Sequence, residues 1–165
     1  MILDIGGLDL KHHDEIQRAC HFFMATLCQP HRKKLYESVN VRIEFKNRFA
    51  DEGCVEWTDR RVKPRHFVVE LKKKNLRETL KTLAHEFTHI YQYATGDMTD
   101  VGEGVVLFKK NKYKQYQDDD LMNAKLYYRL PWEIDAQGWE ISLYQLYYLE
   151  YHQKLGKMPN YSLRK

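Results

Sequence analysis

The segment from residue 75 to residue 95 constrains the fold most, because it predicts one long helix that carries a HExxH motif. Within LAHEFTHIYQ, the motif consists of His85, Glu86 and His89. Four residues are slightly more than one helical turn, so the two imidazoles project from the same face and can bind one cation. Glu86 is placed to accept a proton from water beside that cation. The segment therefore predicts a zinc site built on a helix.

The predicted helix has defined ends and a defined apolar face. Asn75 is a good N-cap with Glu78 three positions on, and Gly96 predicts the C-terminal end. The apolar stripe contains Leu76, Leu80, Leu83, Phe87, Ile90 and Ala94. At 100° per residue, the midpoint of the two motif histidines lies about 155° from this stripe. The histidines are therefore on the polar face, where the alternative to a metal site is a pair of solvated imidazoles.

A catalytic zinc site normally has three protein ligands and one open position, so a third ligand is required. The metzincin extension of the motif fails, because Gln92 and Thr95 stand where that pattern has glycine and histidine. No histidine lies between His89 and His152. The third ligand is therefore either a carboxylate or the remote His152.

The best carboxylate for this role is Glu133, in the sequence LPWEIDAQGWE. Pro131 predicts the start of a last helix, and Ala136 is small enough to let that helix approach the HExxH helix closely. Acidic residues are also common in the first turn of any helix, because the helix dipole favours them there. The remaining alternatives for the third ligand are Glu140, Asp135 and His152.

The other segments predict an α+β fold in a single domain over residues 1–165. Residues 14–28 have the apolar spacing of a helix. Residues 39–45, 55–57 and 67–71 alternate as strands do, and the short connections between them favour an antiparallel meander. The expected first half is therefore an N-terminal helix and a small, mostly antiparallel sheet, followed by the HExxH helix.

The second half of the chain predicts a hairpin and a long C-terminal helix. Residues 105–108 and 112–116 are the two strands of the hairpin. The acidic run at 118–120 predicts a turn before a Tyr-rich segment. The last helix should begin at residue 131 and continue to about 156.

Composition and charge leave the partners of this chain open. The sequence lacks a run of about 18 apolar residues and a convincing signal peptide, which predicts a cytoplasmic protein without a membrane span. Cys20, Cys28 and Cys54 have no CxxC spacing and are expected to be reduced thiols. The net charge of +4 includes basic clusters at 72–74 and 109–114. They permit nucleic-acid binding, but such clusters are more often solvated surface residues.

The order of these motifs resembles the small SprT-like or gluzincin-like metallopeptidases, including forms encoded by bacteriophages. The resemblance covers about residues 39–150 and rests on the HExxH helix, the hairpin, the Tyr-rich segment and PWE followed by Ala. It implies a zincin-like fold in which His85 and His89 bind zinc and Glu86 is the general base. SprT has a downstream histidine as third ligand, which this chain lacks. The gluzincin pattern Glu-x-x-Ala instead transfers that role to Glu133.

The function expected from these residues is hydrolysis of peptide bonds, with Glu86 as catalytic base and zinc as cofactor. The edge of the strand at 67–71 is expected to hold an extended peptide or protein substrate by strand addition. Candidates for stabilising the oxyanion are Tyr127, Tyr128 and Arg129.

Two other functions remain open on the sequence alone. One is a non-catalytic, zinc-stabilised module that binds nucleic acid through the basic clusters, and the other is a DNA-associated protease of the SprT type. Glu86 favours an enzyme, because a structural zinc site has no use for a general base beside an open position.

Overall fold

In the part of the chain that the structure describes, two small sheets and three long helices enclose one core. The computed structural model describes the chain apart from residues 8–9, 115–120 and 155–165, so the expected turn at 118–120 lies outside the described residues. In order, the elements are β1 (Ile2–Gly6), α1 (Leu10–Cys28), α2 (Lys33–Ser38), β2 (Asn40–Lys46), β3 (Gly53–Trp57), β4 (His66–Lys72), α3 (Leu76–Thr95), β5 (Met98–Gly102), β6 (Val105–Phe108), β7 (Asn111–Lys114), α4 (Leu121–Tyr127) and α5 (Pro131–Lys154). The mixed α+β class and the long C-terminal helix are confirmed.

The larger sheet has the strand order β1, β2, β4, β3, and the expected antiparallel meander is wrong. β1 pairs with β2 and β2 pairs with β4 in parallel, and only β3 runs antiparallel, beside β4. β4 contains Phe67, Val69 and Leu71, all buried, and it takes the centre of the sheet, where both of its edges are paired. β3 is only half-buried and lies at the edge. The strand order places the most apolar strands, β2 and β4, at the centre of the sheet, where they are most buried. The lengths of the connecting loops do not determine it.

One strand of this sheet was not expected from the sequence. β1 aligns Leu3 with Val41 and Ile5 with Ile43. Its alternation is interrupted by Asp4 and followed by two glycines, which weakens the pattern of a strand. The backbone pairing with β2 therefore stabilises β1 as a strand, although its own sequence only weakly favours one.

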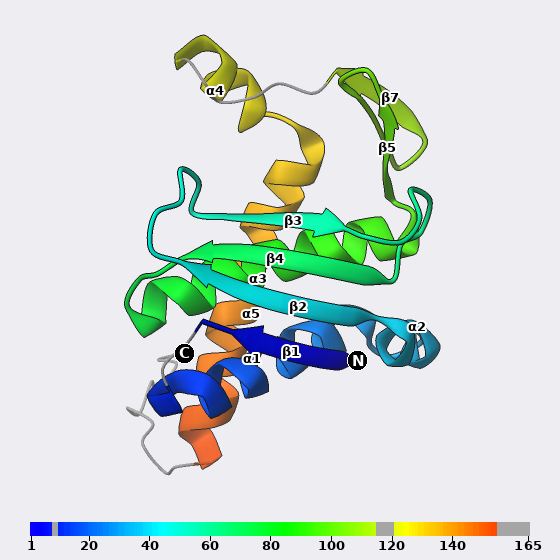
Figure 1. Ribbon diagram of the computed structural model, residues 1–165. Coiled ribbons are helices and arrows are strands. Elements are labelled where there is room, and N and C mark those ends of the chain that lie inside the picture. Colours follow the sequence, from blue (N-terminus) through cyan, green and yellow to red (C-terminus); the bar gives the residue numbers. More distant parts are fainter. Residues whose placement is uncertain (8–9, 115–120, 155–165) are drawn as a thin grey trace, which may run out of the picture.

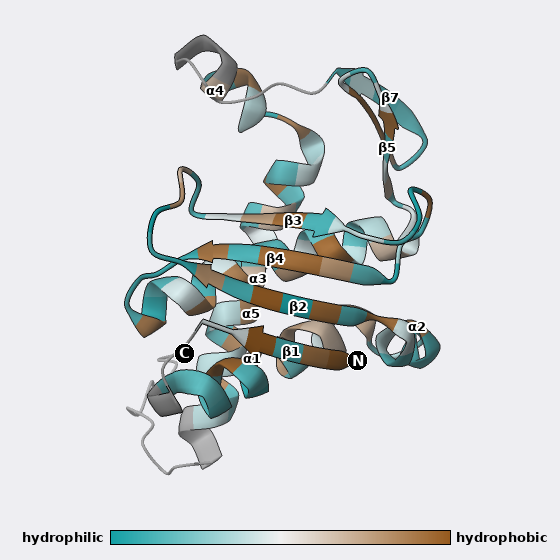
Figure 2. Cartoon of the chain, in the orientation of Figure 1, coloured by the Kyte–Doolittle hydropathy of each residue, from teal (hydrophilic) through white to brown (hydrophobic). Residues whose placement is uncertain are grey.

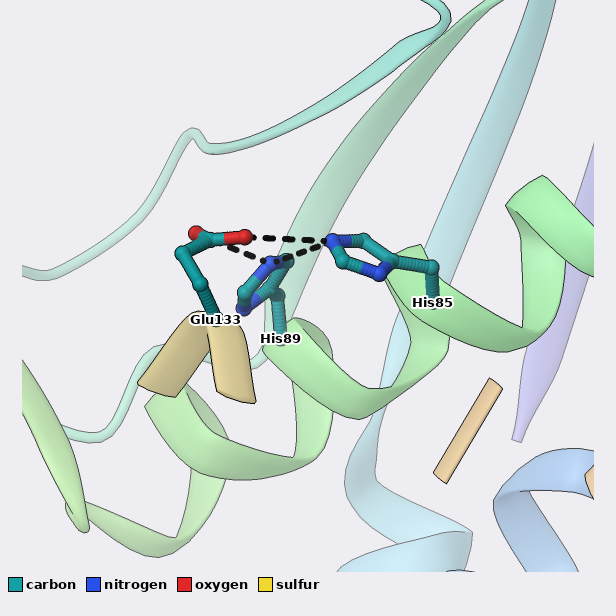
Figure 3. Close-up of side chains that lie close together, drawn as sticks. All are labelled: His85, His89 and Glu133. Carbon is teal, nitrogen blue, oxygen red and sulfur yellow. Dashed lines mark hydrogen bonds and ion pairs between the residues drawn. The ribbon is translucent and has the colours of Figure 1, made fainter. Parts of the chain in front are cut away.

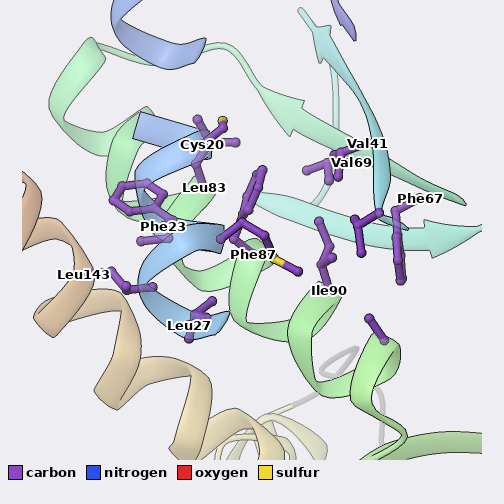
Figure 4. Close-up of a cluster of buried hydrophobic side chains, with 14 of the residues drawn as sticks. Cys20, Phe23, Leu27, Val41, Phe67, Val69, Leu83, Phe87, Ile90 and Leu143 are labelled. Carbon is purple, nitrogen blue, oxygen red and sulfur yellow. The ribbon is translucent and has the colours of Figure 1, made fainter. Parts of the chain in front are cut away.

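Helix α3 lies at the centre of the molecule, against α1, α5 and the inner faces of β3 and β4 (Figure 1). Figure 2 shows the apolar residues concentrated along β1, β2 and β4. The core between the sheet and the helices includes Cys20, Phe23, Leu27, Val41, Phe67, Val69, Leu83, Phe87, Ile90 and Leu143 (Figure 4). The predicted apolar stripe of α3 is therefore confirmed as its core face.

The ends of α3 are those that the sequence predicted. The side chain of Asn75 accepts a hydrogen bond from the Glu78 backbone N–H at 3.0 Å. At the other end Gly96 has φ 82°, and its N–H donates to the Tyr93 carbonyl. Only glycine adopts this left-handed conformation without a steric cost, so the helix ends there.

The smaller sheet contains β5, β6 and β7, all antiparallel. The predicted hairpin is confirmed as β6 and β7, while β5 was not foreseen. Phe108 and Tyr113 of this sheet contact Trp132, with ring centroids 6.1 and 5.8 Å apart. Trp132 is 2% exposed. The sheet thus holds the first turn of α5 in place.

The structure agrees with two expectations from the sequence, one about membrane-spanning helices and one about the cysteines. Within the described part of the chain, no helix has the length and apolar character that a bilayer span requires. Cys20, Cys28 and Cys54 are free thiols, and the first two are buried. Burial raises the pKa of Cys54 to about 11, so it is a protonated thiol at neutral pH.

Leu143 and Ile141 allow a test of which face of α5 packs inward, because the helix is apolar on several sides. Leu143 is fully buried and Ile141 is 59% exposed. Leu143→Ala should lower the free energy of unfolding by about 2 to 5 kcal/mol, because it leaves a cavity in the core. Ile141→Ala, on the same helix, should change it by less than about 0.5 kcal/mol. Chemical denaturation of both variants measures the difference, and equal losses would show that the packed face is assigned wrongly.

Candidate metal centre

His85, His89 and Glu133 converge on one point between α3 and α5 (Figure 3). His85 Nε2 lies 3.4 Å from Glu133 Oε2, and His89 Nε2 lies 3.4 Å from Glu133 Oε1. The two Nε2 atoms are 3.1 Å apart. Among the described residues these three form a group that could hold a metal ion.

The spacing of the three side chains fits a tetrahedral cation. Zinc binds histidine nitrogen and carboxylate oxygen at about 2.0 to 2.2 Å, which places neighbouring ligand atoms of a tetrahedron about 3.4 Å apart. The two Nε2 atoms, 3.1 Å apart, are near this separation, and each of them lies 3.4 Å from one of the two oxygens of Glu133. With one ligand atom taken from each residue, all three lie within 4.8 Å of one another. Two imidazoles and one carboxylate are also a donor set of catalytic zinc sites, which leaves the fourth position open.

Local structure explains how the donors meet. The histidines lie on the face of α3 opposite its buried stripe, and Glu133 lies in the first turn of α5. The Glu133 N–H donates to the Leu130 carbonyl at 3.0 Å, which begins the helix. Ala136, one turn on, is fully buried. A side chain this small lets α5 approach α3 closely, as the sequence predicted.

The carboxylates considered as alternative ligands lie behind the histidines instead. Glu140 Oε2 is 3.4 Å from His85 Nδ1, the nitrogen that faces away from the three-residue group. Asp135 Oδ2 accepts a hydrogen bond from Gln92, and Gln92 Oε1 lies 2.9 Å from His89 Nδ1. Such partners orient metal-binding histidines without touching the metal. The side chain of His152, the fourth candidate, lies outside the described residues.

The electrostatics of the site favour positive charge at its centre. Burial alone lowers the pKa of His85, but the carboxylates of Glu133, Glu140 and Glu86 outweigh it and raise that pKa to about 10. Burial likewise raises the pKa of Glu133, but the two imidazoles outweigh it and hold that pKa well below its usual range. A divalent cation among these groups satisfies the same preference that a proton on His85 does.

Glu86 is buried beside the three-residue group and is not one of the converging ligands. Only 5% of Glu86 is exposed. Burial raises the pKa of its carboxyl, and the attraction of His89 and His85 opposes this rise. A carboxylate with a raised pKa is a better proton acceptor at neutral pH than an exposed one.

Gly53, at the start of β3, belongs to the site, although the sequence analysis did not identify it. A Cβ atom placed on Gly53 would lie 2.7 Å from Glu86 Oε1 and 2.8 Å from Thr82 Cγ2. The absent side chain therefore makes room for the Glu86 carboxylate. The signal that could have found it is a glycine just before the strand pattern at 55–57, since a glycine at a strand often marks a close approach.

Other predicted functional residues are not part of the three-residue group. Tyr127 is the last residue of α4 and Tyr128 follows it; their rings contact each other, and Tyr128 is 54% exposed. In the first basic cluster, Lys72 and Lys74 form ion pairs with Glu52. This pairing reduces the charge that they offer to an anionic partner. The roles in oxyanion stabilisation and nucleic-acid binding stay predictions.

The arrangement can bind a cation through two imidazoles and a carboxylate and can accept a proton at a second, buried carboxylate. Comparisons of the chain with family models, curated proteins and solved structures found no match. The chemistry of the donors and their distances carry the interpretation of the site.

Separate substitutions of Glu133 and Glu140 distinguish a residue that binds the metal from one that only contacts a metal-binding histidine. Glu133→Ala should remove measurable zinc binding at micromolar concentration, because it deletes one of three donors. Glu140→Ala should weaken zinc affinity by about 10- to 100-fold, because it removes only the partner of His85 Nδ1. Titration against a chromophoric chelator measures both affinities, and His85→Ala serves as the control for complete loss. A reversed order would make Glu140 the ligand.

Proposed function

We propose that the chain is a zinc-dependent peptidase in which His85, His89 and Glu133 hold the metal. The observation that carries this proposal is the buried carboxylate of Glu86 next to a three-donor group. A purely structural metal site needs no proton acceptor at that place. The zincin-like fold and the gluzincin-type third ligand are part of the same proposal.

The chemistry divides between the metal and the chain. When bound, zinc acts as a Lewis acid and lowers the pKa of a coordinated water from about 15.7 to about 7. Glu86 accepts the proton of the attacking water at its carboxylate and passes it to the amine that leaves when the C–N bond breaks. The raised pKa of Glu86 suits both steps, since the group must take up a proton and release it again.

The proposed site for the peptide is the free edge of β3, not the strand at 67–71. That strand is β4, which is paired on both sides and cannot accept another strand. Among the strands of the described residues, β3 pairs only with β4, so its other edge presents backbone N–H and C=O groups that no described strand pairs. Gly53 brings the start of β3 next to Glu86. A substrate extended along this edge would pass the proposed catalytic base.

The first test replaces the proposed base by its amide. Glu86→Gln should keep zinc and fold, because Glu86 is not a ligand, and should reduce hydrolysis by about 10² to 10⁴. The measurement is cleavage of a denatured protein, whose extended chain can pair with a strand edge without unfolding first. Glu78→Gln is the matched control, since it makes the same change at an exposed position of α3.

Two outcomes of that test would contradict the proposal. Equal cleavage by wild type and Glu86→Gln would assign the activity to other residues or to a contaminant. Wild type that binds zinc but cleaves no denatured substrate would favour the non-catalytic module, whose nucleic-acid binding would then show as a salt-dependent affinity.

The second test concerns the space at Gly53. Gly53→Ala should keep zinc, because the three atoms nearest to the added Cβ belong to Glu86, Thr82 and Leu71 rather than to a ligand, but it should displace the Glu86 carboxylate. Displacing a catalytic group by about 1 Å can cost about 100-fold in rate, so hydrolysis should fall by about 10- to 100-fold. Zinc content and cleavage rate are measured on the same sample. Full activity would mean that Glu86 does not depend on the space at Gly53.

A further inference from the structure

Gln92 is buried where the metal centre meets α5, and its amide makes three contacts. Its side chain is 1% exposed. Its Oε1 lies 2.9 Å from His89 Nδ1, while its Nε2 donates to the Trp132 carbonyl at 3.1 Å and to Asp135 Oδ2 at 3.0 Å. A buried amide without hydrogen-bond partners lowers the stability of the folded protein. The three contacts satisfy the polar atoms of the Gln92 amide and so offset this cost.

The partners of Gln92 determine which way its amide points. The Trp132 carbonyl can only accept a hydrogen bond, and so can the carboxylate of Asp135 when ionised. The NH₂ group of Gln92 must therefore face α5, since the reversed amide would set its oxygen against two acceptors. Gln92 Oε1 then faces His89, and this oxygen can only accept.

We infer that Gln92 is a positioning residue that fixes the tautomer of His89 for metal binding. Because Oε1 only accepts, the contact requires a proton on His89 Nδ1, which leaves Nε2 as the nitrogen available to a metal ion. That Nε2 is the atom that faces Glu133 and His85 Nε2. This inference rests on one part of the proposed function, namely that His89 binds a metal ion. It does not depend on peptide hydrolysis.

The same side chain of Gln92 that contacts His89 also binds the first turn of α5. Both acceptors of its amide nitrogen, Trp132 and Asp135, flank Glu133 in the same helical turn. One side chain of α3 therefore orients one ligand and holds the turn that carries another. On the other imidazole, Glu140 Oε2 stands at 3.4 Å from His85 Nδ1 and is more exposed. The shorter and more buried contact is the one through Gln92.

The experiment compares Gln92→Leu with wild type by two readouts. Two-bond ¹H–¹⁵N correlation spectra report which nitrogen of His89 carries the proton, and wild type should show the Nδ1–H form before zinc is added. Gln92→Leu should shift His89 toward a mixture of tautomers and weaken zinc affinity by about 10- to 100-fold. Thr88→Val is the matched control, because Thr88 is a buried polar residue of α3 whose hydroxyl donates to the Ala84 carbonyl of the same helix. It should keep both the tautomer and the affinity.

A second variant keeps the inference testable if Gln92→Leu does not fold. Gln92→Glu still accepts from His89 Nδ1, while its second oxygen must be protonated to face the acceptors of α5, so it should retain the Nδ1–H tautomer. Loss of that tautomer in Gln92→Glu would overturn the inference. So would an unchanged tautomer with wild-type zinc affinity in Gln92→Leu. Neither readout measures hydrolysis, so failure of the peptidase proposal and failure of this inference are separate results.

Discussion

The contact between the polar face of α3 and the first turn of α5 is the constraint on which the rest of the structure depends. It buries Glu133, which is 3% exposed, between two imidazoles. A buried carboxylate is strongly unfavourable without positively charged or hydrogen-bonding partners. The site therefore forms only if both helices are held in register. Trp132 packed against the smaller sheet and the amide of Gln92 supply that register.

Helix α3 connects the core to the site because its two faces have opposite roles. Its apolar stripe packs on α1 and the sheet, where Leu83, Phe87 and Ile90 are fully buried. This packing fixes the rotation of the helix about its axis. The histidines consequently face α5 and cannot turn toward solvent without exposing the stripe. Stability of the core and geometry of the candidate metal centre are therefore properties of the same helix.

The edge of the larger sheet completes the arrangement. β4, buried on its inner face, occupies the centre, which leaves the weaker strand β3 at the edge beside α3. Gly53 is the first residue of β3, and the absence of a side chain there leaves space for the Glu86 carboxylate. An unpaired strand edge normally favours aggregation, so a long exposed one is a liability unless it has a use. β3 is only five residues long, which limits that liability.

The sequence by itself determined the features that depend on residues close together in the chain. The ends of α3, its apolar stripe and the shared face of His85 and His89 follow from helical geometry and capping, which are local. Glu133 was identified as the best ligand by its place in a helix start. The tertiary structure alone decided the strand order, the packed face of α5 and the contacts of Glu140 and Gln92 with the two histidines. These depend on which distant surfaces meet, and a helix that is apolar on several sides, or a strand that can pair with several others, does not encode that choice locally.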